Sequence, residues 1–189
     1  MNDILKGELV RLSAVDADEF SKAFSRWRRD SEFMRLLDSG TARVSSQKAE
    51  QKWLEKDLDE QSVHQHSFSF RSLADDRLLG DIGLYVYNWP GRDAFVGLGI
   101  GEREFWGKGY GTDVMRVILR YAFTEVNLNR VTLTVFEYNP RAIRSYEKAG
   151  FRHEGRERKI LNKEGRRWDM LFMGILREEW LELYGEHAS

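Results

Sequence analysis

The sequence contains no cysteine and only two prolines among its 189 residues. The lack of cysteine excludes disulfides, thiolate metal sites and a cysteine nucleophile. No apolar run approaches the roughly 20 residues that a membrane-spanning helix needs, and the first 11 residues lack the apolar segment of a secretory signal. We therefore expect no membrane partner, and the cytoplasm is the expected location by default.

The sequence also has no excess of charge of either sign. It contains 30 basic and 31 acidic residues, for a formal net charge of −1. This balance gives no general attraction for nucleic acid, and none is expected as a partner. A hydrophobic content of 41% is enough for a packed core. The length suits one domain, and no linker, repeat or low-complexity tract divides the chain, so residues 1–189 are predicted to form a single domain.

Hydrophobic periodicity predicts an α/β protein with a mixed sheet. Near the N-terminus we expect two helices, one capped by Asp16 and one starting near Ser45, whose apolar face would carry Ala49, Trp53, Leu54 and Leu58. Another helix is expected over 114–126, one over 140–149 and a short one over 177–184. Strands are expected at 8–13, 66–73, 78–87, 94–102, 131–135, 152–161 and 168–176. The order β-α-α-β-β-β-α-β-α-β-β is not that of a repeated βα array.

A glycine-rich segment lies between the strand expected at 94–102 and the helix expected over 114–126. Alternating glycines let a backbone approach a ligand closely, and the N-terminus of the following helix adds partial positive charge. Together these features favour a phosphate or diphosphate site, although a simple strand-to-helix turn is the alternative. The candidate binding residues are Trp106, Gly107, Lys108, Gly109, Tyr110, Gly111 and Thr112.

Two familiar nucleotide-binding motifs do not fit this segment. A Walker A loop built on Gly107-Lys108 needs glycine at position 102 and serine or threonine at position 109, but the sequence has Glu102 and Gly109 there. A dinucleotide fingerprint needs a third glycine at position 112, which is Thr112. Both classes are therefore disfavoured.

A second segment follows the next predicted strand. Asn139 and Pro140 are preferred residues for the start of a helix, and Gly150 is preferred just after its end. Capping explains these three residues but not Tyr146, which by itself could equally fill the core.

Together, the two segments resemble the GNAT superfamily of acetyl-CoA-dependent N-acetyltransferases. Residues 106–111 are similar to its Arg/Gln-x-x-Gly-x-Gly/Ala motif, and residues 139–151 to its Asn-x-x-Ala-x-x-x-Tyr-x-x-x-Gly-Phe motif. Trp106 departs from the Arg or Gln of many members. The chain also resembles the branch of ribosomal-protein N-terminal acetyltransferases, through the segment Trp-Gly-Lys-Gly-Tyr at 106–110, through Trp27 and through Asp169-Met170 near its C-terminus.

The resemblance implies the GNAT fold, a largely antiparallel sheet flanked by helices, and a role for each matching residue. Tyr146 matches the acid that protonates the leaving sulfur, and Asn139 a residue that contacts the pantetheine or caps its helix. The backbone of Leu98, Gly99 and Ile100 would pair with the pantetheine, although a local bulge is an alternative. Candidates for the CoA phosphates are Lys108, Arg141 and Arg144.

The implied reaction is transfer of an acetyl group from acetyl-CoA to a primary amine by direct attack, without a metal. The amine must lose a proton first, because a lysine-like amine has a pKa near 10.4. Glu102 is the first candidate for this base, with a water relay as an equal competitor. A silent CoA-binding module and a nucleotide-binding oxidoreductase remain alternatives. Acceptor candidates range from protein N-termini to small amines, and a homodimer is allowed by the resemblance.

Overall fold

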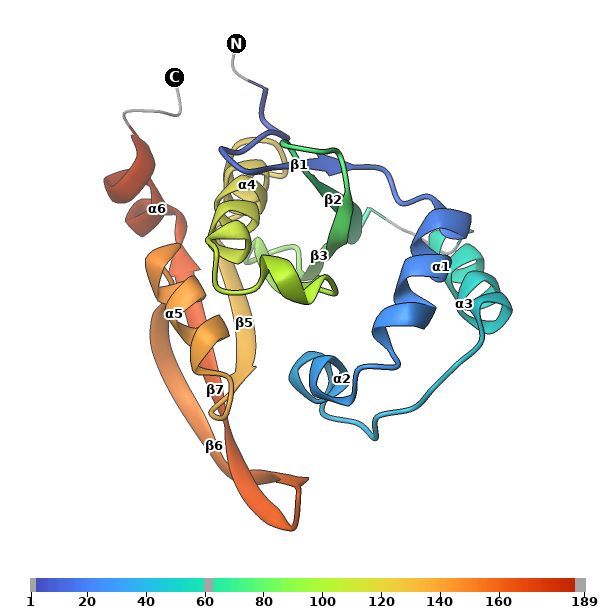
Figure 1. The fold of residues 1–189 in the computed structure, drawn as a ribbon. Helices are drawn as coiled ribbons and strands as arrows, with labels where there is room; N and C mark the ends of the chain where they lie inside the picture. Colours follow the sequence, from blue (N-terminus) through green and yellow to red (C-terminus); the bar gives the residue numbers. More distant parts are fainter. Residues whose placement is uncertain (1–2, 60–62, 186–189) are drawn as a thin grey trace.

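The computed structural model describes residues 3–59 and 63–185, and it has a mixed sheet flanked by helices (Figure 1). The strands are β1 (Val10–Ser13), β2 (Gln65–Ser72), β3 (Leu78–Asn88), β4 (Asp93–Ile100), β5 (Arg130–Phe136), β6 (Arg152–Lys163) and β7 (Arg166–Leu176). The helices are α1 (Ala17–Trp27), α2 (Ser31–Leu37), α3 (Gln47–Asp59), α4 (Tyr110–Thr124), α5 (Pro140–Lys148) and α6 (Arg177–Tyr184), with a 3-10 turn at Arg103–Phe105.

The sheet runs in the order β1-β2-β3-β4-β5-β7-β6. Every neighbouring pair is antiparallel except β4 and β5. These two strands pair only at 93–95 and 130–132, so residues 96–100 of β4 have no partner on that side. The predicted mixed, largely antiparallel sheet is confirmed, and it opens between its two parallel strands.

Helix α4 packs against the sheet and forms much of the main core. Val114, Met115, Ile118 and Leu119 recur at helical spacing and are fully buried. Asp113, in the first turn, accepts hydrogen bonds from the backbone N–H groups of Leu9 and Val10 at 2.8 and 3.0 Å, which fixes β1 beside the helix. Among the described helices, α4 included, none is long and apolar enough to cross a bilayer.

A second, smaller core joins α1, α2 and α3, which gather on one side of the sheet (Figure 1). The sequence predicted two helices here and missed α2. That helix has only seven residues, begins after the cap Asp30 and buries Phe33 and Met34. The predicted burial of Trp53 on α3 is wrong, because its side chain is 60% exposed while the next residue, Leu54, is buried. The buried positions of α3 are Glu50 and Leu54, so the buried face is displaced by one residue from the predicted row of Ala49 and Trp53.

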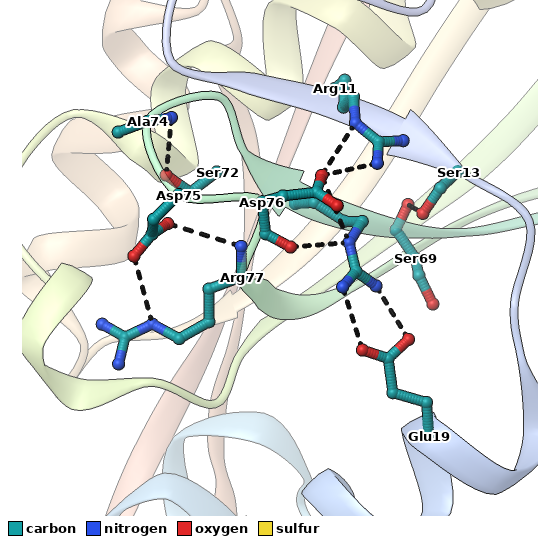
Figure 2. Close-up of polar contacts among 10 residues, drawn as sticks. Arg11, Ser13, Glu19, Ser69, Ser72, Ala74, Asp75, Asp76 and Arg77 are labelled. Atoms are coloured by element: carbon teal, nitrogen blue, oxygen red, sulfur yellow. Dashed lines mark hydrogen bonds and ion pairs between the residues drawn. The ribbon is translucent and has the colours of Figure 1, made fainter.

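Polar contacts attach α1 to the turn between β2 and β3 (Figure 2). Arg71 of β2 donates two parallel hydrogen bonds to the carboxylate of Glu19 on α1, at 2.8 and 2.9 Å. Asp76, in the turn, pairs with Arg11 of β1. Two-pronged arginine–carboxylate contacts fix geometry as well as adding energy, so this network sets where α1 lies over the sheet.

Candidate active site

A cleft of about 230 Å³ lies where β4 separates from β5. Its walls come from α2, the end of β4, the glycine loop before α4, and α5. The lining residues are Phe33, Leu36, Leu37, Leu98, Gly99, Ile100, Phe105, Trp106, Gly107, Gly109, Gly111, Thr112, Asn139, Arg141, Ala142, Arg144, Ser145, Tyr146 and Lys148.

The glycine loop presents unpaired backbone donors to this cleft. Gly107 and Gly109 have φ angles of +73° and +93°, which side-chain-bearing residues rarely adopt. Within the described chain, the N–H groups of residues 107–112 donate no hydrogen bond, and the first amide of the helix to do so is that of Asp113. Successive free amides at the start of a long helix form a site for an anion.

Close contact between α4 and α5 shapes the floor of the cleft. A Cβ atom on Gly111 would lie 3.1 Å from the Ser145 hydroxyl, so glycine allows the two helices to approach. The hydroxyl groups of Thr112 and Ser145 are 3.0 Å apart and hydrogen-bonded. This contact holds the glycine loop against the helix that carries Tyr146.

Trp106 lies between the loop and two arginines. Its indole N–H donates to the carbonyl oxygen of Ile100 at 2.7 Å. The guanidinium of Arg141 is 4.0 Å and that of Arg103 5.0 Å from its ring centre, which are cation–π distances. Arg103 pairs with Asp30 and Glu32. Arg141 forms no ion pair within the described residues, and burial lowers its pKa.

Tyr146 is 8% exposed, and its ring packs edge-on against Phe151. Burial raises the pKa of its hydroxyl to about 12. The hydroxyl has no hydrogen-bond partner in the part of the chain that the structure describes. It therefore faces the cleft in its protonated form with its proton unengaged.

Most of the binding residues predicted from the sequence meet in this cleft. Twelve of the predicted site residues line it, counting the predicted acid Tyr146: Leu98, Gly99, Ile100, Trp106, Gly107, Gly109, Gly111, Thr112, Asn139, Arg141, Arg144 and Tyr146. Asn139 caps α5 by accepting from the N–H of Ala142 at 3.2 Å. Lys108 and Tyr110 are outside the lining set, and Tyr110 packs edge-on against Phe105.

Glu102 also lies outside the lining set. Its carboxylate accepts hydrogen bonds from the guanidinium of Arg26 and, at 3.0 Å, from the indole N–H of Trp27. These contacts attach the end of β4 to α1, and they occupy the carboxylate that the sequence offered as a base. Its role as the base stays a prediction.

The sequence missed helix α2 itself, although it predicted an acceptor wall around 24–37, and Phe33, Leu36 and Leu37 from this segment do line the cleft. The spacing of Phe33, Leu36 and Leu37 after the cap Asp30 was the available signal. It also missed Lys148, which continues the face of Arg141 and Arg144 along α5 at helical spacing.

The histidines within the described residues form no metal site. His66 lies against α4, where its Nδ1 is 3.1 Å from the Tyr121 hydroxyl, and burial lowers its pKa. No group of three or more His, Asp or Glu side chains suited to a metal ion occurs within residues 3–59 and 63–185.

Solved structures share this architecture. Spermidine N-acetyltransferase from Vibrio cholerae, in complex with CoA and spermine, superposes with a TM-score of 0.79 over 91% of this chain and 98% of that chain, at 24% identity. A GNAT-family acetyltransferase from Bacillus anthracis gives a TM-score of 0.76 over 92% and 98%, at 22% identity. At these identities the likeness shows the fold.

Sequence comparison identifies the family. From Bacillus subtilis, the "Putative ribosomal N-acetyltransferase YdaF" is 35% identical over 57% of this chain and 58% of its own length. The "Probable N-acetyltransferase YjcK" is 29% identical over 93% of this chain and 98% of its own. The family model described as an acetyltransferase (GNAT) domain matches residues 8–152. The chain therefore belongs to the GNAT acetyltransferase family, and it is an acetyl-CoA-dependent N-acetyltransferase.

Proposed function

We propose that the cleft binds acetyl-CoA and that the protein acetylates a primary amine, either a protein N-terminus or a small amine. The observation that carries this proposal is the row of free amides at 107–112, which shares one cleft with the unpartnered hydroxyl of Tyr146. One feature binds the anionic part of a CoA molecule and the other supplies a proton to a leaving sulfur.

The loop amides and the α5 cations fit the charge of CoA. A diphosphate is a good ligand for successive N–H groups at a helix N-terminus. Arg141, Arg144 and Lys148 line the same cleft and form no ion pair with a described residue. Their unneutralised charges suit the remaining phosphate of CoA.

The open edge of β4 fits an extended amide chain. Residues 96–100 have no partner on the β5 side, and an unpaired strand edge accepts a further strand through backbone hydrogen bonds. The carbonyl oxygen of Ile100 already accepts a hydrogen bond from the indole N–H of Trp106. We therefore assign the pantetheine contact chiefly to the backbone of Leu98, with Gly99 giving close access.

Tyr146 is assigned as the proton donor. Acetyl-CoA, when bound, supplies an activated acetyl thioester. The Tyr146 hydroxyl, protonated at neutral pH because burial raises its pKa to about 12, gives its proton to the leaving sulfur. The buried ring against Phe151 fixes the direction of that hydroxyl.

The acceptor enters from the side of α2 and the β6–β7 hairpin. The tip of this hairpin contacts the α2 region through Glu164, which pairs with Arg35, and Lys163, which donates to the carbonyl of Gly40. The Tyr138 hydroxyl donates to the Arg35 carbonyl at 2.9 Å. These contacts join the hairpin to the α2 side of the cleft, and we expect them to restrict the shape of the acceptor. The name of YdaF refers to a ribosomal N-acetyltransferase, and the Vibrio cholerae structure is of a spermidine N-acetyltransferase. Protein N-termini and spermidine both carry primary amino groups, which supports an acceptor of this class.

The test is thiol release from acetyl-CoA with a panel of N-terminal peptides and small amines. We expect release with at least one primary amine, together with a rise in melting temperature on adding CoA but not NAD. CoA binding without release across the panel would instead identify a silent CoA-binding module.

Three further predictions are carried forward with this proposal. We keep residues 1–189 as a single domain, the cytoplasm as the location and a homodimer as an allowed state. Size measurement in solution tests the last of these.

A further inference from the structure

A row of three residues crosses the sheet on the face covered by α1 and α2. Asp81 of β3 is the register partner of Ser69 on β2 and of Gly99 on β4. Directly paired residues on neighbouring strands point to the same face. Phe70 and Ile82, their neighbours in sequence, belong to the main core beneath α4, so the row faces the other way, toward α1 and α2.

The carboxylate of Asp81 reaches the cleft at Gly99. A Cβ atom on Gly99 would lie 3.1 Å from Oδ1 of Asp81 and 3.0 Å from the tip of Leu37. Gly99 and Leu37 both line the cleft that contains Tyr146. Leu37 and Asp81 thus close over Gly99, and only the lack of a side chain there lets the Asp81 carboxylate lie directly beside the lining of the cleft.

Two polar side chains at this point lack side-chain partners. The Ser69 hydroxyl is buried, with the residue 2% exposed, and it forms no hydrogen bond. The Asp81 carboxyl interacts with its own backbone N–H, but it has no hydrogen bond to another described side chain and no ion pair with a described lysine or arginine. Buried polar groups are nearly always hydrogen-bonded, so an unpartnered hydroxyl beside a carboxyl that no cation neutralises points to a polar ligand.

The charged and titratable surroundings favour a cationic ligand. Tyr85 lies four residues after Asp81 on β3, and the pKa of its hydroxyl is raised by burial and then by the charges of Asp81 and Asp57. Asp57 comes from α3, and Gln65 of β2 donates to it at 3.1 Å. From α2 the contact is the apolar Leu37, and from β4 it is Gly99. The neighbouring groups are thus acidic or neutral.

We propose that Asp81 is the base of the reaction and takes a proton from the ammonium group of the acceptor, with the Ser69 hydroxyl as a second contact. This inference rests on the proposed acetyl transfer to an amine. It assigns the role to Asp81 in place of Glu102, whose carboxylate already binds Arg26 and Trp27.

The proton balance of the reaction is complete with two side chains. The N–H bond of the ammonium group breaks and an O–H bond forms on Asp81, which leaves the electron pair on nitrogen. The nitrogen–carbon bond then forms as the carbon–sulfur bond breaks, and Tyr146 protonates the sulfur. The acylated nitrogen loses its second proton, which replaces the one that Tyr146 gave to sulfur, and Asp81 releases its proton to water, so each turnover releases one proton overall. Burial raises the pKa of Asp81 to about 7, which suits a base near neutral pH.

The test is the pH profile of kcat/KM with an amine that the wild type accepts. Asp81→Asn should lower kcat by roughly 10²–10⁴-fold and remove the fall in rate below about pH 7. The affinity for CoA and the melting temperature at pH 8 should not fall. Asp59→Asn is the matched control, because it removes an exposed carboxylate from α3; it should retain the wild-type profile.

Chemical rescue provides a second measurement. Formate should restore part of the rate of Asp81→Ala, because it can occupy the vacated space and accept a proton. The assignment would be overturned by a wild-type pH profile in Asp81→Asn, or by loss of the low-pH limb of the profile in Glu102→Gln alone. If Asp81→Asn does not fold, failure of formate to rescue Asp81→Ala would overturn it. A wild-type protein that releases no thiol with any amine would instead refute the proposed function.

Discussion

The indole N–H of Trp106 donates a 2.7 Å hydrogen bond to the carbonyl oxygen of Ile100. The first residue of the glycine loop is thereby attached to the last residue of β4. The tryptophan that replaces the usual Arg or Gln thus positions the loop through its ring, and the guanidinium groups of Arg141 and Arg103 lie at cation–π distance from that ring.

Trp106→Phe should weaken CoA binding about 2–10-fold, because a net hydrogen bond contributes about 0.5–1.5 kcal/mol. Trp106→Leu should weaken it further, since it also removes the aromatic face beneath Arg141. Isothermal titration with CoA measures both variants. Equal affinities for Phe and Leu would show that the ring face does not contribute.

Tyr146→Phe should lower kcat by roughly 10²–10⁴-fold, the usual effect of losing a general acid. CoA affinity should hold, because the ring and its packing against Phe151 remain. Steady-state kinetics and titration with CoA separate the two effects. An unchanged kcat would remove the hydroxyl from the chemistry.

Gly109→Ala should weaken CoA binding and lower stability by about 1–2 kcal/mol, because Gly109 has φ +93° and a side chain there is strained. Gly97→Ala is the matched control: its Cβ would meet no atom within 4 Å, and its backbone is not left-handed. Thermal unfolding with and without CoA measures both. If the two variants lose equal stability and affinity, the left-handed turn is not what holds the loop.

Asp81 should make the free energy of unfolding depend on pH. Its folded pKa of about 7 exceeds the unfolded value near 3.9, so the folded state holds a proton that the unfolded state has lost. The free energy of unfolding should therefore fall as pH rises from about 4 to about 7, by at most about 4 kcal/mol, and change little above that.

Urea unfolding of the wild type and Asp81→Asn at pH 5 and pH 8 measures this dependence. The variant cannot ionise, so its stability relative to the wild type should be higher at pH 8 than at pH 5. The same pH dependence in both proteins would show that Asp81 is not the group responsible.

Local patterns in the sequence predicted most of the elements. Beside the sheet opening, polar and apolar residues alternate along β5, and α5 carries its start and stop signals at Asn139, Pro140 and Gly150. The missed helix α2 has seven residues, too few for a periodic pattern to repeat. The wrong burial of Trp53 has the same origin, because adjacent residues on a helix differ by about 100° and only packing decides which is covered.

The sequence by itself determined the glycine loop, the capped helix with Tyr146 and the family, because each depends on residues close together in the chain. Only the tertiary structure brought Asp81 opposite Gly99, engaged Glu102 with Arg26 and Trp27, and placed Ile100 against Trp106. Strand register and the packing of α1 and α2 set these contacts, and both depend on long-range burial that no single segment encodes.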